Sequence, residues 1–179
     1  MLAVTESLWE ETIGTTKKQI KYNTDNNLSP KALIISEFIN KIVVLAHNYN
    51  INRDNIVFEI TERETVKSFS LLERFVQNLK LQGFSFAIDD FGSGFSSFHY
   101  IKKFPIDYIK IDGDFIINIT KDKKDVAFVK SIVALAKELK VKTIAEFVEN
   151  EEILEFLKDI DIDYVQGYHI GKPNKEIRM

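Results

Sequence analysis

The sequence contains no cysteine and has only three prolines and seven glycines among its 179 residues. Without cysteine the chain has neither disulfide bonds nor thiolate metal ligands, so an oxidising compartment is not indicated and we expect the protein in the cytoplasm. The scarcity of proline and glycine excludes collagen-like repeats and leaves no flexible linker that would divide the chain. We therefore expect a single domain over residues 1–179.

Long apolar runs and a strong net charge are also absent. No stretch of about 18 apolar residues occurs, so we expect no segment that spans a membrane. The segment Met1–Lys21 carries Glu6, Glu10 and Glu11 where a signal peptide would have a basic and then an apolar stretch. The formal charge of -3 provides no positive field for a nucleic-acid polymer. A phosphate-bearing partner would need local help, such as a metal ion.

The sequence does contain a repeated pattern, in which a short apolar run ends on a polar residue and is followed by a segment with helical spacing. This alternation predicts successive βα units, as in an α/β barrel. The runs lie at residues 56–59, 84–89, 108–110, 143–146 and 164–166, with a weaker one near Asn27. A complete (β/α)8 barrel has eight strands and about 250 residues. We therefore predict an incomplete barrel of about six units, with residues 1–26 assigned to a helix and a linker.

Residues with capping preferences stand where the predicted helices begin and end. Asp122 and Asp125 are suited to the start of one helix, Asn150 is suited to cap the last helix, and Gly83 is suited to end the helix before residues 84–89. These signals place the intervening helices between the predicted strands.

Polar residues end nearly every predicted strand, and the carboxyl ends of parallel strands meet at one rim. A single such residue is usually a helix cap or a loop partner. Several carboxylates at one rim, however, need cations to offset their repulsion. The residues that we expect at this rim are Asn27, Glu59, Asp89, Asp90, Lys110, Glu146 and Gln166.

The ligand chemistry of this rim favours a hard cation. Its candidate ligands are oxygen atoms, and the three histidines do not have metal-ligand spacing, so Mg²⁺, Mn²⁺ or Ca²⁺ is expected rather than Zn²⁺. The adjacent Asp89 and Asp90 have the arrangement in which one carboxylate bridges two cations and the other holds the second. The alternative is a turn in which one of the two carboxylates caps the following loop.

Two further residues have both a chemical and a structural interpretation. Lys110 would face the barrel interior, where it could hold a water or stabilise charge, but it could equally form a structural ion pair with Asp112. Glu146 is either a general base or metal ligand, or a buried partner of Lys110. Among the aromatic residues, Phe95, Phe98 and Tyr168 could stack on a base at the mouth of the site, with core packing as the alternative.

Six short motifs, in this order along the chain, resemble those of the EAL-domain family of cyclic di-GMP phosphodiesterases, which are metal-dependent (β/α) barrels. The motifs are Asn27-Leu28-Ser29, Glu59-Ile60-Thr61-Glu62, Asp89 to Gly94, Lys110-Ile111-Asp112, Glu146 to Glu149, and Gln166-Gly167-Tyr168. The resemblance implies hydrolysis of cyclic di-GMP to linear pGpG with two Mg²⁺ or Mn²⁺ ions.

Carried over position by position, the resemblance also implies roles for individual residues. Asn27, Glu59 and Asp89 would hold one metal, and Asp89, Asp90 and Glu146 the second. Lys110 would position the attacking water, and Glu146 would also help to deprotonate it. Glu62, Asp112, Glu149 and Gln166 would occupy substrate or loop positions, with Glu62 bracing the loop after Asp90.

The chain departs from the family pattern at two points. No Glu-Ala-Leu motif, which supplies a further metal-ligand Glu, precedes Asn27, and Phe147 stands where the family usually has Gly. The chain thus resembles the C-terminal portion of the domain, for which we expect weakened metal binding and doubtful catalysis. We also expect self-association, or a partner that completes the barrel. The alternatives are a catalytically inactive binding or regulatory module and, ranked last, proton abstraction beside a carbonyl.

Overall fold

The structure is a computed structural model, and it describes residues 18–21, 31–61, 69–93 and 101–172. The strands are β1 (Lys18–Lys21), β2 (Ile56–Thr61), β3 (Ser85–Phe91), β4 (Tyr108–Ile111), β5 (Lys142–Ala145) and β6 (Tyr164–Val165). The helices are α2 (Lys31–Asn48), η1 (Arg53–Asn55), α4 (Phe69–Leu81), α6 (Gly113–Ile116), α7 (Lys123–Leu139) and α8 (Glu151–Asp159).

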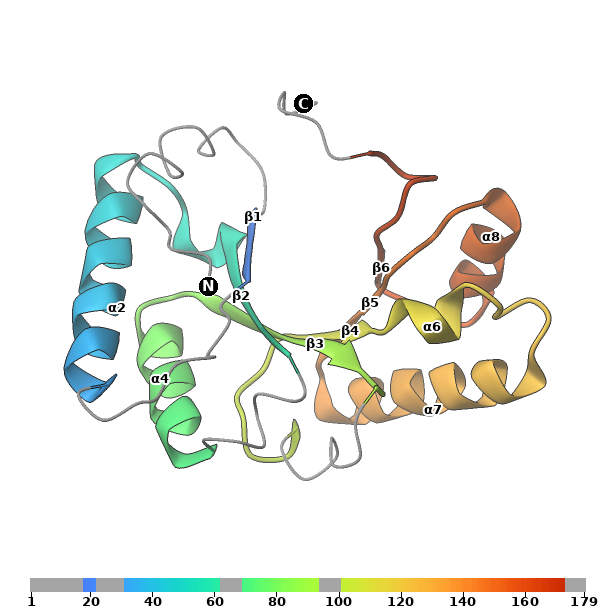
Figure 1. The fold of residues 1–179 in the computed structure, drawn as a ribbon, viewed down its shortest axis with the longest axis horizontal. Helices are drawn as coiled ribbons and strands as arrows, with labels where there is room; N and C mark the ends of the chain where they lie inside the picture. Colours follow the sequence, from blue (N-terminus) through green and yellow to red (C-terminus); the bar gives the residue numbers. More distant parts are fainter. Residues whose placement is uncertain (1–17, 22–30, 62–68, 94–100, 173–179) are drawn as a thin grey trace.

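The strands form one parallel sheet in the order β1-β2-β3-β4-β5-β6, so each strand pairs with its neighbour along the chain. Figure 1 shows α2 and α4 beside the β1–β3 half of the sheet, and α7 and α8 beside the β4–β6 half. Sequential parallel strands with helices between them are typical of a (β/α) barrel. Among the described residues β1 and β6 are the two ends of this order, so the described strands form an incomplete barrel, as the sequence predicts.

The first strand differs from the expectation for residues 1–26. The sequence predicts a helix and a linker in this segment, but Lys18–Lys21 pairs in parallel with β2, Lys21 lying opposite Glu59. The alternation of polar and apolar residues in this stretch is short, and its strand pairing depends on contact with β2, which local sequence does not report. The weak strand that we expected near Asn27 lies outside the described residues.

Helix boundaries follow the capping signals in the sequence. The side chain of Asp122 accepts a hydrogen bond from the backbone N–H of Lys124 (2.7 Å) at the start of α7, and Asn150 accepts one from Ile153 (2.9 Å) at the start of α8. Gly83 follows α4 with φ +87°, a conformation that suits glycine. These caps confirm where the predicted helices begin and end, which fixes the strands between them.

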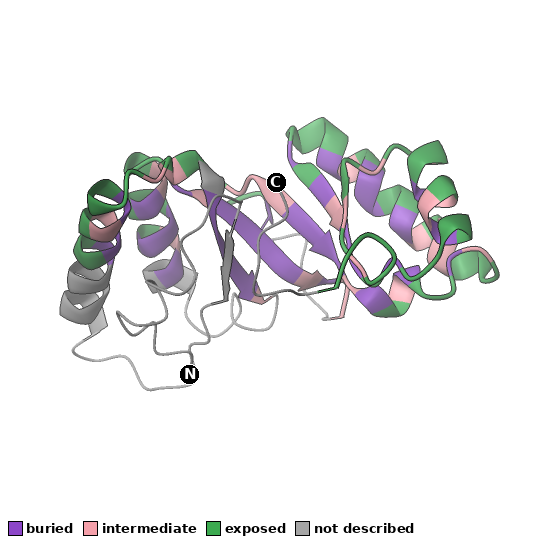
Figure 2. Cartoon of the chain, turned by 90° about the horizontal axis from the view of Figure 1, so that it is seen from above, coloured by how far each residue is buried: buried purple, intermediate pink, exposed green. Residues whose placement is uncertain are grey.

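Apolar side chains pack between the sheet and its helices in two clusters. In the first, Phe58, Ile60 and Phe86 of the strands meet α2 and α4; in the second, Ile109 and Ile111 meet α7 and α8. Figure 2 shows the strands and the facing sides of the helices in the colour of buried residues, while the outer sides of the helices are exposed. Successive side chains of a strand point to opposite faces. The residues between these apolar positions therefore point to the other, inner face.

The length and apolar character of the described helices can be compared with what a membrane-spanning helix needs. None of them combines the length and the apolar character that crossing a bilayer requires.

Candidate active site

Lys110 of β4 lies at the centre of a group of acidic side chains that come from β2, from β3 and from the residue after β5. Its Nζ is 2.6 Å from Oδ1 of Asp89, 2.8 Å from Oε1 of Glu146 and 3.2 Å from Oε1 of Glu59. The side chain of Lys110 is completely buried, and those of Glu59 and Asp89 are 1% exposed. A lysine without solvent contact is tolerated only when its charge is compensated, and here the acids of the rim supply that compensation.

Strand alternation explains why these side chains meet. Lys110 stands between Ile109 and Ile111, both of which are buried against the helices, so its own side chain points to the inner face. Glu59 stands in the same way between Phe58 and Ile60. The apolar neighbours thus anchor each strand on the helix layer, and the charged residue between them is turned inward.

A β-bulge places Asp89 and Asp90 together. Strand β3 pairs with β4 through Ile88 with Ile109 and then Phe91 with Ile111, so two aspartates stand opposite the single residue Lys110. Asp90 has φ +54°, and this local kink cancels the alternation that would otherwise send adjacent side chains to opposite faces. Both carboxylates are therefore available at one rim.

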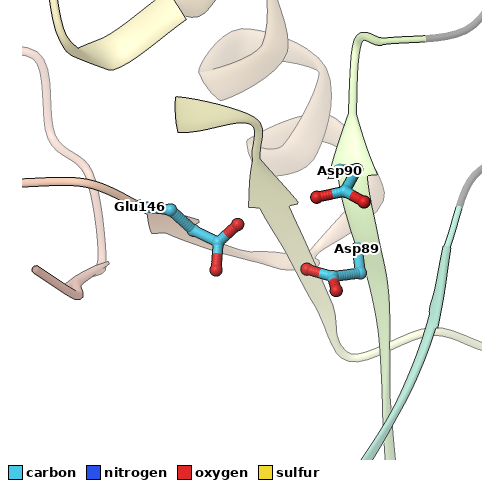
Figure 3. Close-up of side chains that lie close together, drawn as sticks. All are labelled: Asp89, Asp90 and Glu146. Atoms are coloured by element: carbon cyan, nitrogen blue, oxygen red, sulfur yellow. The ribbon is translucent and has the colours of Figure 1, made fainter. Parts of the chain in front are cut away.

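Asp89, Asp90 and Glu146 form a group with the spacing of metal ligands. One carboxylate oxygen of each lies within 4.8 Å of the others, and Figure 3 shows the Glu146 carboxylate pointing across β4 toward the two aspartates. Oxygen ligands of Mg²⁺ or Ca²⁺ lie about 2.0–2.6 Å from the ion, so two ligands of one ion are roughly 4–5 Å apart at most. The three carboxylates fit a hard divalent cation by both chemistry and spacing.

The electrostatics of the rim favour a positive partner. Four acids, Glu59, Asp89, Asp90 and Glu146, share the neighbourhood of one lysine. Burial alone would lower the pKa of Lys110, but the charges of Glu59 and Glu146 and the hydrogen bonds to Asp89 and Glu146 outweigh it and hold this pKa above its usual range. Lys110 is thus a permanent cation, and the remaining negative charge is suited to bind a metal ion.

The other predicted site residues are distributed differently. Asn27, Glu62, Phe95 and Phe98 lie outside the described residues. The carboxylate of Asp112 accepts a hydrogen bond from the N–H of Asp114 (3.0 Å) and caps α6, while Lys110 makes its described ion pairs with the three acids named above. Glu149 and Gln166 are exposed beyond β5 and β6, and the backbone of Gln166 bonds to Ala145 and Val148. Asp112 therefore does not act as the structural partner of Lys110.

Phe147 and Gly113 are two residues at this rim for which the sequence suggested no role. Phe147 follows Glu146, is 55% exposed and has φ +56°. A Cβ atom on Gly113 would lie 2.1 Å from Cδ2 of the Phe147 ring, so the ring rests directly on this glycine. The sequence singled out Phe147 only as a departure from the family pattern, and it held no signal for Gly113.

Comparisons with known proteins agree on one family. The EAL domain family matches residues 4–173. The Cyclic di-GMP phosphodiesterase PdeB of Shewanella oneidensis is 42% identical over 147 residues, which are 82% of this chain and 17% of that protein. The Probable cyclic di-GMP phosphodiesterase PdeA of Escherichia coli is 34% identical over 174 residues, which are 96% of this chain and 24% of that protein. The chain thus spans about a fifth of these relatives.

A solved structure shares the fold as well. It is a standalone EAL protein from Vibrio cholerae in its c-di-GMP bound form, with a TM-score of 0.78 and 29% identity, covering 93% of this chain and 68% of that one. Because the family match covers residues 4–173 and relatives at least 34% identical align over most of the chain, this chain belongs to the EAL domain family.

Proposed function

We propose that this chain is the catalytic part of a phosphodiesterase that hydrolyses cyclic di-GMP to linear pGpG with divalent metal ions. The observation that carries the proposal is the group of Asp89, Asp90 and Glu146, whose carboxylate oxygens lie within 4.8 Å of one another beside a buried lysine. Relatives that are 34–42% identical over most of the chain carry the name of this activity.

Asp89, Asp90 and Glu146 would hold one divalent cation, and Glu59 stands on the other side of Asp89, where the resemblance expects a second. We propose Mg²⁺ or Mn²⁺ as the ions. When bound, they supply Lewis acidity toward the phosphodiester and lower the pKa of a bound water. The buried acids of the rim have little net affinity for an anion by themselves, so a substrate phosphate needs this positive charge.

Glu146 is the candidate for accepting the proton of the attacking water. Its side chain is 10% exposed, whereas those of Glu59 and Asp89 are 1% exposed, so among the acids that contact Lys110 it is the one that solvent reaches. Lys110 cannot serve as the base, because its raised pKa keeps it protonated. Its ammonium is instead suited to donate a hydrogen bond to the water or to the phosphate. Hydrolysis joins the water oxygen to phosphorus and breaks one phosphorus–ribose oxygen bond, and the ribose oxygen takes up a proton and leaves as a hydroxyl.

The direct test is to incubate the chain with cyclic di-GMP and Mg²⁺ or Mn²⁺ and to separate the nucleotides by chromatography. We expect pGpG to form, with loss of activity in Glu146→Gln and in a metal chelator. Glu155→Gln is the matched control, because it removes the same charge from an exposed position of α8. Binding without turnover would identify the chain as an inactive EAL module. A chain that neither binds nor hydrolyses cyclic di-GMP would contradict both functions.

We also propose that this chain associates with a second copy or with a partner protein through the edge strands of its sheet. Edge strands present unpaired backbone groups that favour association. Among the described residues, β1 and β6 are the ends of the sheet order, and Tyr164 of β6 is 44% exposed. Light scattering at increasing concentration tests this proposal. A chain that stays strictly monomeric at high concentration would contradict it.

A further inference from the structure

The backbone at Phe147 is unusual for an aromatic residue. Its φ of +56° lies in the left-handed region, which glycine adopts without steric cost and other residues adopt only at a penalty. The described non-glycine residues that share this conformation include Asn50, Lys140 and Asp161, which lie just after helices. Phe147 instead directly follows Glu146 of the metal-ligand group. Unfavourable backbone conformations that persist at a site rim suggest a role for the side chain that they present.

The ring of Phe147 is supported from one side. Three ring atoms of Phe147, Cδ2, Cγ and Cε2, lie 2.1–2.9 Å from the position that a Cβ on Gly113 would occupy. The absence of that Cβ lets the ring lie against the backbone at the start of α6. Any side chain at residue 113 would displace the ring, so Gly113 determines where the ring lies.

The remaining surface of the ring faces solvent. Phe147 is 55% exposed, although its neighbours Ala145 and Val148 are fully buried. An aromatic ring that served only to fill the core would be covered, since burial is the source of its stabilisation. Phe147 therefore offers an open apolar face one residue away from Glu146, whose carboxylate belongs to the metal-ligand group.

We propose that one guanine base of the dinucleotide substrate stacks on the ring of Phe147, whose position is determined by Gly113. The phosphodiester of the same dinucleotide is hydrolysed at the metal-ligand group beside this ring. This role rests on the proposed function and determines part of its substrate affinity. Nucleobases stack on aromatic side chains because every base has a flat π-face. A base is joined to its phosphate through one ribose, which matches a platform beside the phosphate site rather than within it.

The test measures the binding of pGpG, which keeps both bases and is not a substrate for ring opening. In titration calorimetry with Mg²⁺ we expect Phe147→Leu to bind pGpG roughly 5- to 150-fold more weakly than the wild type. Phe147→Tyr, which retains a ring, should bind within about threefold of the wild type. Tyr49→Leu is the matched control, because it removes an exposed ring after α2, away from the rim.

Two further measurements separate a stacking role from a structural one. Mn²⁺ affinity should be the same in Phe147→Leu and in the wild type, because the carboxylates are unchanged. Gly113→Ala should weaken pGpG binding in the wild type, where it displaces the ring, but should have little additional effect in Phe147→Leu. Equal pGpG affinities of Phe147→Leu and the wild type would overturn the stacking role while leaving the hydrolase proposal intact. A wild type that binds neither cyclic di-GMP nor pGpG would overturn both.

Discussion

Carboxylates link neighbouring strands both where the strands begin and where they end. The partners of these carboxylates differ between the amino ends and the carboxyl ends of the strands. At the amino ends of the strands, Asp107 and Asp163 each have one lysine partner and backbone donors. At the carboxyl ends, Glu59, Asp89 and Glu146 share the single Lys110. We refer to these groups as the amino-end aspartates and the carboxyl-end acids.

The amino-end aspartates form a repeated structural device. Asp107 accepts a hydrogen bond from the N–H of Phe86 (2.8 Å) and pairs with Lys80 (2.5 Å), and so connects β3 and α4 to the start of β4. Asp163 accepts one from the N–H of Thr143 (2.9 Å) and pairs with Lys142 (2.5 Å), connecting β5 to β6. Their charges and lone pairs are satisfied within the protein, which stabilises the register of the sheet.

The carboxyl-end acids leave an excess of negative charge in a place with almost no solvent. Like charges in such surroundings cost free energy that the fold must supply elsewhere. The comparison therefore separates two uses of the same chemical group. Where carboxylate charge is balanced it stabilises the sheet, and where it is in excess it creates affinity for a cation.

The largest expected effect comes from removing the cation of the carboxyl-end acids. Lys110→Met leaves three buried acids without their shared partner, and we expect the free energy of unfolding to fall by about 3–5 kcal/mol at pH 7. Urea denaturation measures this loss. Added Mn²⁺ should recover part of it, because the ion replaces the missing positive charge.

The pH dependence of Lys110→Met adds a second check. The contribution of Lys110 is fully present below about pH 10.4, the pKa of an unfolded lysine, and it is lost as pH rises through the higher pKa of the folded state. The difference in stability between the wild type and Lys110→Met should therefore shrink in strongly alkaline solution. A variant as stable as the wild type at pH 7 would show that the acids are not held as a charged group.

A smaller change removes one charge from the metal-ligand group and leaves Lys110 in place. Asparagine tolerates the positive φ of Asp90, so Asp90→Asn should keep the fold. We expect at least about a 10- to 100-fold loss of Mn²⁺ affinity, by analogy with changes at metal sites, together with unchanged or slightly higher thermal stability. Glu155→Gln, which neutralises an exposed acid on α8, is the control. Unaltered Mn²⁺ binding in Asp90→Asn would separate this residue from the metal site.

The carboxyl-end acids were predictable from sequence because strand period and chain order are both local signals. Glu59 and Lys110 stand between pairs of apolar residues, and the alternation places them on the inner face. The rule that parallel strands end at a common rim then brings them together. The sequence also predicted the cap Asn150 and the start of a helix at Asp122, both of which depend on residues within one helical turn.

Other features depend on contacts that local patterns do not contain. The sequence did not predict the bulge at Asp89 and Asp90, because it arises from the register between β3 and β4. It also did not identify β1, whose strand character requires β2 beside it. The amino-end aspartates were missed as well, although the tripeptide Ile-Asp-Tyr occurs at both 106–108 and 162–164 and could have indicated a repeated role.

The amino-end aspartates should affect stability and not catalysis. Asp163→Ala leaves the buried N–H of Thr143 without its acceptor, so we expect a loss of about 1–3 kcal/mol in the free energy of unfolding. Activity on cyclic di-GMP, measured well below the unfolding midpoint, should stay within twofold of the wild type. A large loss of activity with unchanged stability would show that Asp163 acts in catalysis and not in holding the sheet together.

Acid titration tests the same aspartate. Burial raises the pKa of Asp163, but the hydrogen bonds from Lys142 and Thr143 outweigh it and lower this pKa below its usual value. Its contribution is therefore present above about pH 3.9, the unfolded pKa, and is lost as pH falls through the lower folded pKa. The stability difference between the wild type and Asp163→Ala should diminish below that pH.

We expect the smallest effect on stability from a carboxylate that belongs neither to the amino-end aspartates nor to the carboxyl-end acids. Glu155 pairs with Lys158 at 2.5 Å on α8, but both side chains are 58% exposed, so water and salt already screen their charges. The hydrogen bond from Lys158 lowers the pKa of Glu155, yet Glu155→Gln should shift the midpoint of thermal unfolding by less than Asp163→Ala does. The shift should also disappear in 1 M salt, whereas that of Asp163→Ala should largely persist. Equal changes of the two shifts in 1 M salt would contradict this explanation. They would show that the amino-end aspartates act as ordinary surface ion pairs and not through backbone hydrogen bonds.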